Sequence, residues 1–157
     1  MTENAAERSL DPRVGSHIRE SLDRVLRWTS RPTNRLRLYG SAAELSQNEV
    51  WLLDAVDSAG QLRLSDLATW QGVDKSTITP QVRKLEQRGL LQRSADSSDR
   101  RAARLVLTPQ GRALQKRRAD AGTALVDAVL QDWPVEDRIA FARLFSRFLD
   151  QLDDDHS

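Results

Sequence analysis

The chain contains no cysteine and only two histidines, His17 and His156. The lack of cysteine excludes disulfides, thiolate metal sites and thiol redox sensing. Two histidines without a cysteine do not supply the ligand set of a transition-metal sensor. No Ser/His/Asp set, phosphate-binding glycine loop or pair of facing carboxylates can be found in the sequence. We therefore expect neither an enzyme nor a protein that depends on a cofactor.

Proline, glycine and long apolar runs are also scarce. Five prolines and seven glycines in 157 residues argue against a loop-rich fold. No apolar run approaches the length of a membrane span, and the polar, acidic N-terminus is unlike a signal peptide. We expect a cytoplasmic protein without a membrane partner. The length fits one domain with a modest core, and the 30% of charged residues suggest long solvated helices.

The net charge is only +1, but it is unevenly distributed. Residues 75–118 hold twelve Lys or Arg and three Asp or Glu, a net of +9, which leaves −8 for the remainder. A basic block in an otherwise acidic chain is typical of a nucleic-acid binder. The alternative is a solvated helix face that happens to be rich in arginine.

Residues 74–110 form the most informative stretch. Ile78, Val82 and Leu85 recur at helical spacing and predict one buried stripe. Gly89 follows where a helix end needs a left-handed residue, with Leu90 behind it as an apolar anchor. Beyond a polar loop, Ala103, Leu105 and Leu107 alternate with Arg104, Val106 and Thr108, and this period of two predicts a strand. A helix followed by a hairpin with a basic tip is the winged form of the helix-turn-helix.

The region before it supplies the rest of that motif. Ser46 and Glu49 have the spacing of a capping box, which starts a helix that we expect to reach about Ser58. Residues 62–64 predict a short strand against the wing, and a short helix begins at Leu64 or Ser65. The turn at residues 71–73 then leads to the recognition helix.

Pro80 lies inside the predicted recognition helix. If Asp74 is the N-cap, Pro80 takes the sixth helical position and removes a hydrogen bond. If Ser76 is the cap, Pro80 takes only the fourth position and the loss is small. The sequence leaves both alternatives open.

Long helices flank this motif. Apolar spacing predicts a helix from Pro12 to about Ser30, one from Pro109 to about Gln131, and a last one from Pro134 to Leu152. Residues 31–44 are expected to be irregular. The first and last helices have apolar stripes without a partner in the small winged core, so we expect them to pack across a two-fold axis in a homodimer. Packing within one monomer is the alternative.

Three features of residues 88–111, RGLLQRSADSSDRRAARLVLTPQG, resemble the wing of the MarR family of bacterial transcription regulators. They are Arg88-Gly89-Leu90, the spacing Asp99-x-Arg101-x-x-x-Leu105, and Leu107-Thr108-x-x-Gly111. Residues 64–90 are similar to that family's helix-turn-helix, and the resemblance covers roughly residues 12–152. It implies a mainly α fold with a small β-wing, a winged helix-turn-helix whose terminal helices form a dimerisation lobe. The expected parts are a disordered N-terminus (1–11), a dimerisation helix and connector (12–44), the DNA-binding lobe (45–108), dimerisation helices (109–152) and an acidic tail (153–157).

Candidate contacts to double-stranded DNA follow from side-chain chemistry and position. We expect Lys75, Ser76, Thr77, Thr79 and Gln81 to enter the major groove, Arg83, Lys84, Arg104 and Arg112 to face phosphates, and Asp99, Arg100 and Arg101 to form the tip of the wing. Arg101 suits a narrow minor groove, with Asp99 holding it extended. The alternative is that this pair only fastens the loop.

The family resemblance implies a regulator, expected to be a repressor, that binds an inverted-repeat operator as a homodimer. It also implies release by a small aromatic or phenolic effector, for which Trp28, Arg35 and Trp51 are the candidate contacts. The alternative is that Trp51 and Trp70 are ordinary core or helix-packing residues. The rival function is a winged-helix module that binds protein and has no specific affinity for DNA.

Overall fold

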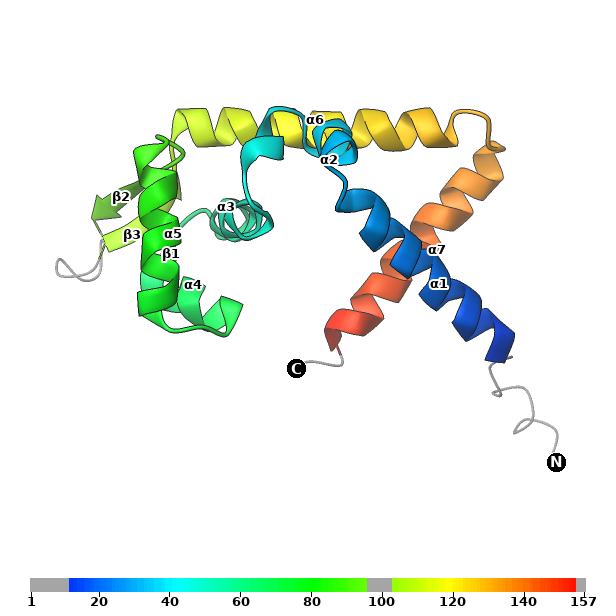
Figure 1. Cartoon of the computed structure of the whole chain (residues 1–157), viewed down its shortest axis with the longest axis horizontal. Helices are drawn as coiled ribbons and strands as arrows, with labels where there is room; N and C mark the ends of the chain where they lie inside the picture. Colours follow the sequence, from blue (N-terminus) through cyan, green and yellow to red (C-terminus); the bar gives the residue numbers. More distant parts are fainter. Residues whose placement is uncertain (1–11, 96–102, 155–157) are drawn as a thin grey trace, which may run out of the picture.

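The computed structural model describes residues 12–95 and 103–154. A lobe at one end holds the sheet with α3 (Gln47–Ala59), α4 (Leu64–Gln71) and α5 (Lys75–Gln87) (Figure 1). The long helix α6 (Pro109–Leu130) leads away from the lobe and passes α2 (Pro32–Tyr39), and α1 (Pro12–Thr29) and α7 (Val135–Asp154) cross in this view at the far end. The fold is mainly helical with a small sheet, as predicted. Its elements are α1 (Pro12–Thr29), α2 (Pro32–Tyr39), the 3-10 helix η1 (Gly40–Glu44), α3 (Gln47–Ala59), β1 (Leu62–Arg63), α4 (Leu64–Gln71), α5 (Lys75–Gln87), β2 (Leu91–Ala95), β3 (Ala103–Leu107), α6 (Pro109–Leu130) and α7 (Val135–Asp154).

The three strands form an antiparallel sheet in the order β1-β3-β2. Leu62 lies opposite Leu105, and Leu91 lies opposite Leu107. Leu105 and Leu107 are buried, while the alternate residues Arg104 and Val106 are half-buried. Leu105 and Leu107 thus share the side of β3 that faces the core, whereas Ala103 at the start of the strand is exposed. The predicted hairpin strands and the short third strand are confirmed.

The core lies wholly within the lobe and the first turns of α6. Ile78, Val82 and Leu85 of α5 have no exposed surface, which confirms the predicted stripe. The apolar members of the core are Ala42, Leu45, Val50, Leu52, Leu53, Val56, Leu67, Ala68, Ile78, Val82, Leu85, Leu90, Leu91, Leu105, Leu107 and Leu114.

Local hydrogen bonds fix the ends of the helices that frame the site. Gly89 has φ +69°, and its N–H donates to the Glu86 carbonyl at 2.9 Å while the Leu90 N–H donates to the Leu85 carbonyl at 3.0 Å. These paired bonds end α5 in the predicted left-handed turn. At the start of α6, the Thr108 hydroxyl accepts from the Gly111 N–H at 2.9 Å.

Gly111 is required by packing rather than by its backbone conformation. A Cβ at this position would lie 2.2 Å from the Leu90 carbonyl oxygen. The start of α6 therefore packs directly against the chain that leaves α5. This close approach fixes where the long helix leaves the lobe.

The connector at residues 31–44 is helical, which corrects the prediction of an irregular segment. Pro32 ends α1, but it also occupies the first turn of α2, where its missing N–H costs nothing. Gly40, at φ +53°, then ends α2. Arg35 holds the segment in place, because its Nη2 donates to the Leu45 carbonyl at 2.6 Å.

The start of α5 decides between the two readings of Pro80. The helix begins at Lys75, so Pro80 occupies the sixth helical position. Asp74 has the extended backbone of an N-cap, but its side chain makes no capping hydrogen bond. Of the two alternatives, Asp74 is therefore the N-cap residue, although its side chain does not cap the helix.

The tryptophans of the lobe correct a second alternative. Trp51 is 47% exposed and Trp70 is 57% exposed, so neither is a core residue. Trp51 follows Val50 directly in α3, and one step of 100° takes it off the buried stripe formed by Val50, Leu53 and Val56.

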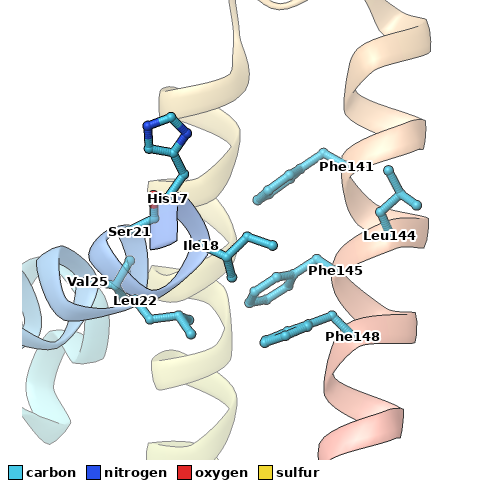
Figure 2. A pocket seen from close by; sticks show the side chains of 9 residues that line it. All are labelled: His17, Ile18, Ser21, Leu22, Val25, Phe141, Leu144, Phe145 and Phe148. Carbon is cyan, nitrogen blue, oxygen red and sulfur yellow. The ribbon is translucent and has the colours of Figure 1, made fainter. Parts of the chain in front are cut away.

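The terminal helices α1 and α7 contain no buried residue within the part of the chain that the structure describes. Ile18 and Leu22 of α1 point toward Phe141, Phe145 and Phe148 of α7 across an open apolar groove of about 430 Å³ (Figure 2). The rings of Phe141 and Phe145 stack with their centroids 5.6 Å apart. Both helices thus keep their apolar stripes largely in contact with solvent.

Candidate nucleic-acid interface

The outward face of α5 is a surface opposite the buried stripe. Ser76, Pro80 and Arg83 are exposed at i, i+4 and i+7, and Thr77 is exposed beside them. This face therefore carries two small hydroxyl groups (Ser76 and Thr77), one cation (Arg83) and one proline ring (Pro80). Pro80 lies at the centre of this face although it was not among the predicted base contacts. Helical spacing counted from Ser76 would have identified it.

The five predicted base contacts differ in accessibility. Lys75, Ser76 and Thr77 are exposed, whereas Thr79 and Gln81 are half-buried. The Thr79 hydroxyl donates to the Lys75 carbonyl at 2.5 Å, and the Gln81 Nε2 donates to the Thr77 carbonyl at 3.4 Å. The Gln81 Oε1 is enclosed and has no hydrogen-bond partner among the described residues. A base contact by Gln81 would need its side chain to turn outward.

The four predicted phosphate contacts are spread over α5, β3 and α6. Arg83 is exposed on the outward face of α5. The Lys84 Nζ instead lies 3.0 Å from the Glu49 Oε1. The Arg112 Nη1 donates to the Leu107 carbonyl at 2.7 Å, and Arg104 is half-buried in β3 and also takes part in an interaction within the chain.

The predicted wing-tip residues Asp99, Arg100 and Arg101 lie outside the described residues. The base of the wing is well defined, because Ala95 of β2 pairs with Ala103 of β3. An ion pair of 2.8 Å between the Arg93 Nε and the Glu86 Oε1 joins β2 to α5. The wing therefore starts from a fixed position beside the recognition helix.

The carboxylate of Glu49 is a buried charge at the start of α3. Burial raises the pKa of Glu49, but the Ser46 N–H and hydroxyl together with the Lys84 ammonium outweigh it, so the pKa lies below its usual range. The Ser46 N–H donates to the Glu49 Oε2 at 2.7 Å, and the Ser46 hydroxyl accepts from the Glu49 N–H at 3.3 Å. The predicted capping box is thus confirmed, and its carboxylate has a second partner that the sequence did not indicate.

A polar cluster joins α3 to α6. The Gln115 Nε2 donates to the Asp54 Oδ1 at 2.6 Å, and the Arg118 guanidinium pairs with the same oxygen. The Arg118 Nε also donates to the Gln115 Oε1 at 3.1 Å. Since Gln115 is buried, this cluster fixes the lobe on the long helix that leads to α7.

The groove that Trp28 lines includes neither Arg35 nor Trp51, the other two candidate effector contacts. Trp28 lines an open groove of about 480 Å³ together with Val25 and Val129. Arg35 is engaged with the Leu45 carbonyl, and its guanidinium lies 5.3 Å from the centre of the Tyr39 ring. Trp51 is exposed on α3 and does not line the groove beside Trp28.

Within residues 12–95 and 103–154, no group of three or more His, Cys, Asp or Glu side chains could hold a metal ion. None of the helices in these ranges is both long and apolar enough to cross a membrane.

Comparisons with known proteins agree with this architecture. Residues 45–103 match the model of the MarR family. The chain is 28% identical over 103 residues to YxaD, an uncharacterised HTH-type transcriptional regulator of Bacillus subtilis strain 168. That match covers 66% of this chain and 72% of YxaD.

Solved structures extend the likeness beyond the winged lobe. A MarR-like transcriptional regulator from Thermotoga maritima is 25% identical with a TM-score of 0.67, over 88% of this chain and 95% of that protein. FabT of Streptococcus pneumoniae, solved in complex with DNA, is 22% identical with a TM-score of 0.66, over 90% of this chain and 96% of FabT. The latter likeness establishes the fold.

Proposed function

We propose that the chain is a member of the MarR family of transcriptional regulators, whose model its residues 45–103 match, and that it acts in the cytoplasm as a homodimeric repressor that binds an inverted-repeat operator. The observation that carries the proposal is the outward face of α5, where Ser76, Thr77 and Arg83 are exposed beside the base of the wing. In winged helix-turn-helix proteins the recognition helix enters the major groove. Two lobes related by a two-fold axis would then read two half-sites about 34 Å apart.

The proposed contacts to DNA are of two kinds, those to base edges and those to phosphates. The exposed side chains that contact base edges are those of Lys75, Ser76 and Thr77. Thr79 and Gln81 also contact bases when their side chains give up their hydrogen bonds to the α5 backbone and turn outward. The cations Arg83, Arg104 and Arg112 face phosphates. The wing residues Asp99, Arg100 and Arg101 approach the minor groove, whose negative potential favours an arginine. Base contacts set the sequence that is bound, while phosphate contacts strengthen binding to every sequence.

The dimer is formed by α1 and α7. Exposed apolar side chains on one side of each helix form a continuous surface, which a monomer in water does not normally leave open. Charged and polar residues occupy the other side of α7. A second copy that packs its own α1 and α7 into the groove of Figure 2 covers this surface and gives an isologous interface. The large residues that it would cover are Ile18, Leu22, Phe141, Leu144, Phe145 and Phe148.

Release from DNA follows from a change in the separation of the two lobes. A small aromatic or phenolic effector in the groove beside Trp28 would contact both α1 and α6. Such a ligand shifts the population only as far as it prefers one lobe spacing over the other. Candidate ligands are therefore screened by their effect on DNA affinity, and not by binding alone.

The test is selection of a random duplex library by the purified protein, followed by sequencing and by salt titration of the enriched duplex. The expected result is a palindromic motif whose half-sites are centred about 10 base pairs apart, with an affinity that falls steeply as salt rises. A winged-helix module that binds only protein would enrich no motif and have no salt slope. That result would overturn the proposal.

A further inference from the structure

The contact between Lys84 and Glu49 joins the recognition helix α5 to the start of α3. The Lys84 Nζ lies 3.0 Å from the Glu49 Oε1. The Glu49 side chain is 3% exposed, whereas the Lys84 side chain is 59% exposed. The ammonium therefore covers a carboxylate that the rest of the lobe already shields from water.

The two oxygens of Glu49 have different partners. Oε2 accepts the Ser46 N–H in the capping box at 2.7 Å. Oε1 makes no well-aligned hydrogen bond within the described part of the chain, so the ammonium of Lys84 supplies its counter-charge. A buried carboxylate that loses its counter-charge is strongly unfavourable. Neutralising Lys84 would thus leave an uncompensated charge under the recognition helix.

The same contact also suits the two helices that it joins. Glu49 lies in the first turn of α3 and Lys84 in the last turn of α5. A negative charge at a helix start and a positive charge at a helix end both oppose the helix dipole. The apolar stripe of α5 supplies most of the attraction to the core, but that attraction is not directional. The ion pair has a defined position, so it adds a constraint on the rotation of α5 about its axis to the one that the buried stripe supplies.

We propose that Lys84 is a positioning residue, which holds the outward face of α5 toward the DNA, instead of the phosphate contact that its place in the sequence predicts. This inference rests on the proposed DNA binding. Rotation matters because Ser76, Pro80 and Arg83 lie on one face, and a turn of the helix moves all three together.

The experiment compares Lys84→Met with Arg83→Met, a matched loss of one cation from the adjacent residue. Both variants are titrated with salt against a labelled duplex of mixed sequence and melted by circular dichroism. Arg83→Met should reduce the salt slope by about one unit per subunit and leave the melting temperature nearly unchanged. Lys84→Met should lower the melting temperature by about 5–10 °C and also weaken binding to the duplex, because the outward face of α5 is no longer held toward the DNA.

A double variant separates positioning from a general loss of structure. Glu49→Gln keeps the capping box, because Gln accepts the Ser46 N–H as Glu does. In Glu49→Gln with Lys84→Met there is no buried charge to compensate. This variant should recover most of the melting temperature and most of the DNA affinity lost in Lys84→Met. If Lys84→Met alone does not fold, recovery of a folded, DNA-binding double variant supports the inference equally.

Two results would overturn the inference. One is a smaller salt slope for Lys84→Met at an unchanged melting temperature, which is the behaviour of a phosphate contact. The other is a double variant that binds DNA no better than Lys84→Met. Failure of the wild-type protein to bind the duplex with any salt dependence would instead count against the proposed function. The two failures are therefore distinguishable.

Discussion

The DNA-binding lobe and the terminal helices use the same apolar helical spacing with opposite results. In α5 the stripe of Ile78, Val82 and Leu85 is completely buried within the chain. In α7 the comparable residues Phe141, Phe145 and Leu149 remain 42–45% exposed. Both patterns predict a helix with one apolar side. The spacing does not say whether the partner surface belongs to the same chain or to another.

This contrast divides the molecule by function. The lobe has its own core and a fixed outward face, so its stability depends on internal contacts. The terminal helices complete their packing only against a second copy, under the proposed assembly. The cluster of Asp54, Gln115 and Arg118 lies between the two regions and ties α3 to the long helix α6. Substitutions in the two regions should therefore have different signatures.

The largest effect is expected at the proposed dimer surface. Phe145→Asp with Phe148→Asp places two charges in the apolar groove of Figure 2, so the protein should become a monomer or lose its fold. Sedimentation velocity measures the assembly state and anisotropy measures DNA binding, which should be abolished. Arg143→Asp is the control, since it makes the same total change in charge on the opposite side of α7. A double variant that sediments as a dimer would contradict the proposed interface.

The second effect tests the internal core of the lobe. Leu53 has no exposed surface, so Leu53→Ala should lower the free energy of unfolding by about 2–5 kcal/mol. Leu36→Ala, at a residue 61% exposed on α2, should change it by less than about 0.5 kcal/mol. Urea denaturation followed by circular dichroism measures both values. Equal losses in the two variants would show that burial in this structure does not describe the folded protein.

The sequence predicts best what depends on near neighbours. The capping box of Ser46, the left-handed turn at Gly89 and the burial of Leu105 and Leu107 on one side of β3 are all confirmed. Each depends on contacts a few residues apart or on a simple period. The fold class follows from adding these elements together.

Contacts between distant residues could not be predicted in this way. Residues 31–44 carry weak apolar spacing, and the bond from Arg35 to the Leu45 carbonyl exists only once α2 packs beside the start of α3. From the sequence alone, Lys84 is interpreted as a solvent-facing cation. No pattern in the sequence indicates that it pairs with Glu49, which lies 35 residues earlier. The cation-rich stretch thus predicts a nucleic-acid surface without specifying which cations belong to it.

The third effect concerns the wing, which should act on DNA affinity without changing assembly. Arg101→Ala should weaken binding to the selected duplex by about 1–3 kcal/mol if the guanidinium enters the minor groove. Asp99→Ala should weaken it less, because the carboxylate only orients Arg101. Anisotropy at low and moderate salt measures the affinities, with sedimentation as the control for the dimer. Wild-type binding by Arg101→Ala under both conditions would remove the wing from the proposed interface.

The smallest effect is the dependence of stability on pH. The pKa of Glu49 is lowered in the folded lobe from its ordinary value of 4.5, because the contacts with Ser46 and Lys84 outweigh the cost of burial. A group whose pKa is lowered by folding contributes stability above its unfolded pKa and loses it as the pH falls through its folded pKa. The contribution of Glu49 is therefore complete at neutral pH and declines below about pH 4.5. Glu49→Gln cannot titrate, so its melting temperature should fall less than that of the wild type between pH 6 and pH 3. Since this loss belongs to the lobe, Phe145→Asp with Phe148→Asp should leave the difference in place if that variant folds. If the melting temperatures of wild type and Glu49→Gln fall by the same amount between pH 6 and pH 3, the ion pair with Lys84 adds no stability to the lobe.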